Sequence, residues 1–213
     1  MAALARDDPA RPVRWGARAI ALFAARVLAW GVPLFAAWYL ATAPLSIASG
    51  WVAARLAELA MPVDRVPVRY RGGSLVFDAE PDEQTLWRNR LPAAVALEAR
   101  ANPMQFTCSI PFFLALVLAT SLRPAWRRTV MGAGVLLLLA SAGLYFDVHL
   151  QLAQVPGPGG GPLFATGPLA REAIALGFQL STLLVPVLAP IVLWAAGEGR
   201  TRILPGREAG EGG

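Results

Sequence analysis

The sequence predicts a mainly α-helical integral membrane protein, with four transmembrane helices and a small extracytoplasmic β-meander between helices one and two. The chain has 213 residues, is 56% hydrophobic and has a mean hydropathy of +0.50, which is too apolar for an ordinary soluble domain. Four stretches without a charged residue are each roughly long enough to cross about 30 Å of hydrocarbon as a helix. These stretches are residues 27–45, 101–122, 129–146 and 173–197.

Arginine clusters beside these stretches indicate how the chain is oriented. All 19 basic residues are arginine, and the net charge is +5. The clusters precede the first stretch (Arg6, Arg11, Arg14, Arg18, Arg26), separate the second from the third (Arg123, Arg127, Arg128) and follow the fourth (Arg200, Arg202, Arg207). Basic residues collect on the cytoplasmic side, so both termini are expected in the cytoplasm. The same positions favour contact with membrane lipid and argue against a nucleic-acid partner.

The stretches and clusters divide the chain into five parts. We expect a cytoplasmic basic tail over 1–18, transmembrane helix 1 over 19–45, an extracytoplasmic segment over 46–101, transmembrane helices 2–4 over 102–197 and a cytoplasmic tail over 198–213. Arginine without lysine is typical of GC-rich coding, which favours a bacterial source. The expected location is therefore the bacterial inner (cytoplasmic) membrane, in a multi-pass arrangement.

The extracytoplasmic segment should begin with a helix and continue as strands. Pro44 should mark the outer end of the first span. Residues 46–60 read as an interfacial helix with a broad apolar face. Val66, Val68 and Tyr70 then alternate with polar residues or proline.

A glycine pair follows this alternation. Gly72 and Gly73 supply a two-residue turn, so a hairpin is expected between strands near 65–71 and 74–79. After an acidic turn from Glu80 to Glu83, alternation over 93–100 predicts a third strand. Three strands resting on the membrane face are expected, because a hairpin alone is marginally stable.

The second span should begin at Asn102 and Pro103, with the asparagine as N-cap and the proline at the first helical position. Pro111 should kink this helix. Small residues such as Gly132 and Gly134 should mediate helix packing. The glycine-rich loop over 150–170 reads as a flexible linker rather than a phosphate site.

Three residues near the outer face could carry chemistry. Cys108 lies five residues into span two, His149 ends span three and Arg171 opens span four. With Asp147 nearby, they could supply a thiolate nucleophile, a base and an oxyanion stabiliser. Alternatively, Cys108 is a packing residue and Arg171 pairs with an acid or contacts lipid phosphates. No metal-ligand spacing is found, so neither a metal nor a cofactor is expected.

The stretch NPMQFTCSIPFFLALVLATSLRPAWRR resembles exosortases and archaeosortases, which are membrane transpeptidases. Cys108-Ser109 matches the start of the Cys-Ser-Gly motif of that family, and Trp126-Arg127-Arg128 matches its basic cytoplasmic turn. Ile110 replaces the motif's glycine, and 141–146 lacks the Asn-x-x-Arg segment that carries the family's catalytic arginine.

The chain more closely resembles the small exosortase-associated membrane proteins of the type linked to exosortase H. Asn102-Pro103, Phe106 and Pro111 carry this resemblance, which covers roughly residues 60–150. It implies a non-catalytic accessory protein that binds an exosortase or the C-terminal transmembrane segment of its substrate. The alternative is a divergent membrane Cys transpeptidase that uses Cys108, His149 and Arg171, so whether the chain is an enzyme stays open.

Overall fold

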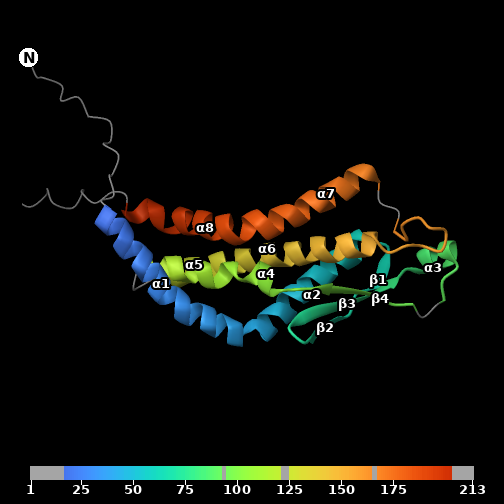
Figure 1. The fold of residues 1–213 in the computed structure, drawn as a ribbon, viewed down its shortest axis with the longest axis horizontal. Helices are drawn as coiled ribbons and strands as arrows, with labels where there is room; N and C mark the ends of the chain where they lie inside the picture. Colours follow the sequence, from blue (N-terminus) through green and yellow to red (C-terminus); the bar gives the residue numbers. More distant parts are fainter. Residues whose placement is uncertain (1–16, 93–94, 121–124, 165–166, 203–213) are drawn as a thin grey trace, which may run out of the picture.

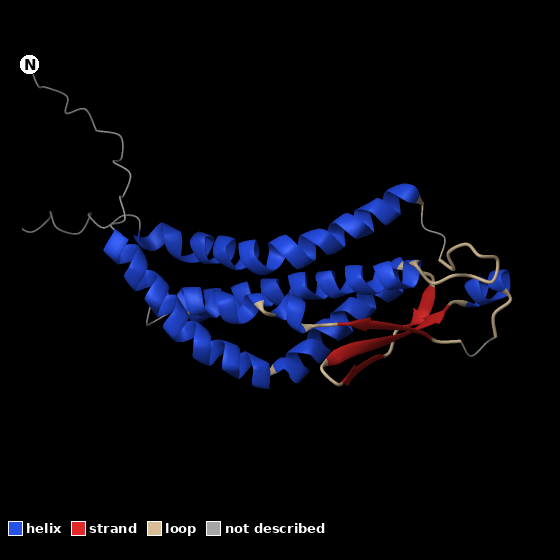
Figure 2. Cartoon of the chain, viewed as in Figure 1, coloured by secondary structure: helices blue, strands red, loops and turns tan. Residues whose placement is uncertain are grey.

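The computed structural model describes residues 17–92, 95–120, 125–164 and 167–202 (Figure 2). The helices are α1 (Ala17–Leu40), α2 (Thr42–Ala60), α3 (Glu83–Asn89), α4 (Met104–Thr107), α5 (Ser109–Thr120), α6 (Trp126–Ala153), α7 (Pro168–Gln179), a π-helical turn η1 (Leu180–Leu184) and α8 (Val185–Arg202). The strands are β1 (Val63–Arg65), β2 (Val68–Arg71), β3 (Ser74–Pro81) and β4 (Leu97–Ala101). Most of the two expected tails, 1–16 and 203–213, lies outside the described residues.

Within the residues that the structure describes, three helices are long and apolar enough to cross a membrane. They are α1, α6 and the continuous rod of α7, η1 and α8 up to Gly197. The region expected to form span two is a shorter apolar helix, Met104–Thr120. The mainly helical class with helices that can span a membrane is therefore present, and the fourth span stays a prediction, since residues 121–122 of the expected span lie outside the described chain.

The ends of the long helices that carry the arginine clusters lie together (Figure 1). Arg128 at the start of α6 donates a hydrogen bond from Nη1 to the carbonyl of Gly197 in α8, at 3.3 Å. Trp194 of α8 donates from Nε1 to the Thr120 hydroxyl at the end of α5, at 2.7 Å. The Trp194 ring also lies 5.6 Å from the Phe23 ring of α1. Four helices thus converge at one end of the molecule, and Arg123 of the expected turn falls outside the described residues.

The first helix ends earlier than the sequence analysis expects. The helix is interrupted at Ala41, between α1 and α2. Pro44 lies in the first turn of α2 instead of at the end of α1. A proline is tolerated there because the first-turn N–H groups have no partner within the helix. Small residues of α2, including Ser46, Gly50 and Ala53, are buried. This face packs against α6 and the sheet, while Trp51 on the other face is exposed.

A four-stranded antiparallel sheet forms the far end of the molecule. β3 is central: it pairs with β2 from Arg71↔Ser74 to Val68↔Phe77, with β4 on its other edge, and with β1 near its end. Gly72 and Gly73 connect β2 to β3 with φ angles of +59° and +82°. Such angles cost other residues about 1–2 kcal/mol, which explains the glycine pair. Leu75 and Phe77 are fully buried and form the core together with α2 and α6.

Three details of the outer segment differ from the expectations. The acidic turn is followed by a helix, α3, which Asp82 caps by accepting a hydrogen bond from the N–H of Thr85 at 2.8 Å. The strand expected from residue 93 is β4, and it begins at Leu97, which pairs with Ala79 at the last position where β3 and β4 are paired. Residues 93–94 are outside the described chain. Finally, α6 extends through Ala153, and 155–163 form a hydrogen-bonded hairpin rather than a linker without structure.

Candidate functional site

Asn102 and Pro103 form a compact turn where β4 passes into α4. The Asn102 side-chain oxygen accepts a hydrogen bond from the N–H of Met104 at 3.1 Å. The Pro103 carbonyl accepts two more at 3.0 Å, from the N–H and from the hydroxyl of Thr107. Pro103 and Thr107 are fully buried. The helix α4 begins at Met104 with Pro103 at its N-cap, one residue later than the sequence predicts, and the Asn102 oxygen satisfies the N–H of that first helical residue.

Pro111 accounts for the interruption of the second apolar helix. Proline has no N–H, and its ring collides with the carbonyl four residues earlier, here that of Thr107. The helix accordingly divides into α4, which ends at Thr107, and α5, which begins at Ser109. Cys108 occupies the junction, where its Sγ donates a hydrogen bond to the carbonyl of Gln105 at 3.4 Å. The only cysteine is therefore partly buried and bonded within its own turn.

Phenylalanine rings pack on glycines where the helices meet. A Cβ added at Gly143 of α6 would lie 2.4 Å from the Phe106 ring of α4. Equivalent approaches join Gly132 of α6 to Phe113 of α5, at 2.5 Å, and Gly177 of α7 to Phe146 of α6, at 2.6 Å. The absence of a side chain at each glycine lets two helices approach closely.

Gly134 behaves differently from Gly132. Nothing lies within 4 Å of a Cβ added there, and the residue is exposed. Of the two glycines expected to mediate helix packing, only Gly132 does so within the part of the chain that the structure describes.

The C-terminal end of α6 is held by hydrogen bonds. His149 is buried, and its Nδ1 lies 2.9 Å from the Tyr145 hydroxyl one turn earlier. Gln151 donates to the carboxylate of Asp147 at 2.9 Å. It also donates to the backbone carbonyl of Arg100 at 2.8 Å and accepts from its N–H at 3.1 Å.

Gln151 therefore fixes the edge of β4 to α6. Gln151 is not among the site residues predicted from the sequence, where its only signal is a polar side chain one helical turn after Asp147.

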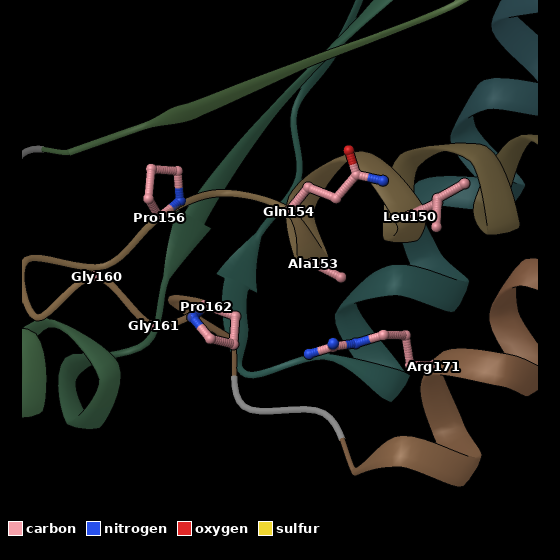
Figure 3. A pocket seen from close by; sticks show the side chains of 8 residues that line it. All are labelled: Leu150, Ala153, Gln154, Pro156, Gly160, Gly161, Pro162 and Arg171. Carbon is pink, nitrogen blue, oxygen red and sulfur yellow. The ribbon is translucent and has the colours of Figure 1, made fainter.

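Arg171 lies in the first turn of α7. It is exposed and lines an open cleft of about 330 Å³ between α7, the end of α6 and the loop over 156–162 (Figure 3). The cleft has largely apolar walls, including Leu150 and Ala153 of α6. His149 is not among the residues that line it.

Cys108, His149 and Arg171 are not in hydrogen-bonding contact with one another within the described ranges. No ion pair within those ranges joins any two of them either. Along α6, His149 lies six residues beyond Gly143, the contact of Phe106, which is about 9 Å of helix rise. A nucleophile and its base need about 2.6–3.2 Å. The described residues also contain no group of three His, Cys, Asp or Glu side chains that could hold a metal ion.

These features define a membrane protein with long apolar helices and a small sheet packed on α2 and α6, in which the motif residues near the second apolar helix serve as cap, kink and packing contact. The family model of the exosortase H-associated membrane proteins matches residues 17–201, and the chain belongs to that family. The resemblance inferred from Asn102-Pro103 is thereby confirmed, over a longer region than the sequence analysis assigned. Comparison with curated proteins and with solved structures gave no match.

Proposed function

We propose that this protein is a non-catalytic membrane accessory protein of an exosortase-type surface-protein sorting system. It acts by binding the sorting enzyme or the C-terminal transmembrane segment of the enzyme's substrate. The observation that carries this proposal is the family match over residues 17–201. Within the described ranges no hydrogen bond or ion pair joins Cys108, His149 and Arg171, which supports a binding role over a transpeptidase role.

The exposed helix surfaces are suited to binding within a bilayer. α1 has no buried residue, and Leu28 and Val32 are 70% and 74% exposed. α8 likewise exposes Val187 and Val192. Apolar helices associate in lipid through close packing rather than through the hydrophobic effect. The exposed faces of α1 and α8 can therefore contact either lipid chains or a partner helix, since both surroundings are apolar.

The proposed topology has four spans in the bacterial inner membrane, with both termini in the cytoplasm and 46–101 outside. Met104–Thr120 is about 26 Å long at the rise of an α-helix, so a few further residues would complete a second span. The arginine-bearing helix ends lie together, as the Arg128–Gly197 hydrogen bond indicates, which supports one cytoplasmic side. Proposed partners thus meet the bundle in the membrane and the sheet outside it.

Reporter fusions test the topology. Fusions after Gly50, Arg100 and Gly160 should report export, and a fusion after Arg128 should report the cytoplasm. A cytoplasmic signal at Arg100 would refute the orientation, because it would move the sheet to the other side of the membrane.

Photo-crosslinking in the source cells tests the binding role. A crosslinking amino acid at exposed Val32 should capture an exosortase or the transmembrane segment of its substrate. The control position is Leu136, which is fully buried in α6 and should give no adduct. A Val32 variant that crosslinks only to lipid, in cells whose surface-protein sorting is active, would contradict the proposal.

A further inference from the structure

The cleft beside Arg171 has a wall of defined shape. The loop that forms it folds back on itself: Leu163 donates a backbone hydrogen bond to Val155 at 2.8 Å, and Gly157 donates to Gly161 at 2.7 Å. Leu150 and Ala153 of α6 complete the apolar side. Arg171 extends from α7 toward this loop (Figure 3). The cleft therefore combines an apolar surface with one guanidinium group.

The charge of Arg171 is not neutralised inside the cleft. The three ion pairs within the described ranges involve Arg55, Arg69 and Arg100. No carboxylate lines the cleft, and the neighbouring Glu172 is not part of its lining. A guanidinium presents paired N–H donors that match the oxygens of a phosphate or carboxylate. The cleft thus favours an anion.

The position of the cleft relative to the membrane hydrocarbon indicates which kind of anion it binds. A helix crosses about 30 Å of hydrocarbon in roughly 20 residues. Counted from Arg128, this length ends near Val148, so Leu150 and Ala153 lie about 3–8 Å beyond it. The same 20-residue length can be counted back from Gly197, which is bonded to Arg128. It then ends near Gly177, and Arg171 lies about 9 Å beyond that end.

The first count places the apolar wall at the level of the lipid headgroups, which extend roughly 5–8 Å beyond the hydrocarbon on each side, and the second places the backbone of Arg171 just beyond their outer limit. A phospholipid provides an anionic phosphate together with an apolar stem. These two features match the guanidinium and the apolar wall.

We propose that the cleft between α6, the 156–162 loop and α7 binds an anionic phospholipid, with Arg171 on the headgroup phosphate and the apolar stem against Leu150 and Ala153. Because the cleft contributes a positive charge and no carboxylate, phosphatidylglycerol should bind more tightly than zwitterionic phosphatidylcholine. This inference goes beyond the proposed accessory function and does not depend on it.

Native mass spectrometry of the delipidated full-length protein, titrated with phosphatidylglycerol, tests the proposal. Arg171→Gln should weaken binding of the first lipid about tenfold, the effect expected for loss of a charge-assisted hydrogen bond. Arg71→Gln is the matched control: it removes the same charge from an exposed residue of β2, outside the cleft, and should leave that affinity unchanged. Equal weakening by both variants, or by neither, would overturn the proposal.

Two further measurements separate the site from general charge. Gly161→Val should also weaken lipid binding, because Gly161 lines the cleft and has open space around the position of a Cβ. Inorganic phosphate should bind far more weakly than phosphatidylglycerol. If inorganic phosphate or phosphatidylcholine binds as tightly as phosphatidylglycerol, the assignment to an anionic lipid is wrong.

Discussion

Gly143→Ala should destabilise the protein although alanine is the better helix former. A Cβ at this position would lie 2.4 Å from the ring of Phe106 and 3.1 Å from the Cβ of Ser181. Phe106 is 2% exposed, so its ring has little room to move. Overpacking a tight contact costs about 1–3 kcal/mol. The preference of a helix for alanine over glycine returns only about 1 kcal/mol.

Gly134→Ala on the same helix is the matched control, since nothing lies within 4 Å of a Cβ there. The helix preference is common to both substitutions and cancels. The variants should therefore differ by the overpacking cost of about 1–3 kcal/mol, which corresponds to about 2–12 °C in the midpoint of unfolding. Thermal unfolding in detergent, followed by tryptophan fluorescence, measures this difference.

A second variant shows whether the clash is the cause. In a Phe106→Leu background the smaller side chain leaves space, so Gly143→Ala should cost less than it does in the wild type. Equal midpoints for Gly143→Ala and Gly134→Ala, or an unchanged cost in the Phe106→Leu background, would refute the reasoning.

Three other outcomes are expected. Gly72→Val should loosen the β2–β3 hairpin without affecting the bundle, because the φ of +59° costs an L-residue about 1–2 kcal/mol; hydrogen exchange resolved by region would show whether protection falls only in the sheet. Asn102→Leu with Pro103→Ala should reduce assembled protein in the membrane more than Cys108→Ala, since it removes a cap contribution of about 1 kcal/mol. Cys108→Ala should leave surface-protein sorting near normal, and loss of sorting at normal protein levels would instead favour the transpeptidase.

Features encoded by a few adjacent residues could be predicted from the sequence. The Gly72-Gly73 turn, the cap at Asn102 and the effect of Pro111 each depend on backbone chemistry within four residues. The membrane class could also be predicted from the sequence, because each long apolar stretch is continuous in the chain. Each of these features has a counterpart in the structure at or next to the expected position.

Features that depend on distant partners could not be predicted. Gly132 and Gly134 look alike in sequence, and only the position of Phe113 on α5 decides which one packs. The sequence also placed His149 and Arg171 at one membrane face. A shared face sets only the depth of two residues in the membrane, and the distance between them within the plane of the membrane depends on how the helices pack.

The contacts of α6 explain the roles of the motif residues Asn102, Pro103 and Phe106 together. Near its start, Arg128 bonds to α8; further along, Gly143 contacts Phe106; near its C-terminal end, Gln151 binds the backbone of Arg100 in β4. The short segment from Arg100 to Phe106 is therefore attached to α6 at two points about 12 Å apart along the helix.

Asn102 and Pro103 lie between these two attachments and hold the turn that joins them. The sheet is consequently fixed in height and direction relative to the helices. A protein that holds an exported segment or a neighbouring enzyme at a set distance from the bilayer needs a rigid connection between its sheet and its helices. A hydrolytic or transpeptidation site would instead need the side chains of Cys108 and His149 to meet. The chemistry of the Asn-Pro segment is therefore that of a rigid connection, which agrees with the proposed accessory role.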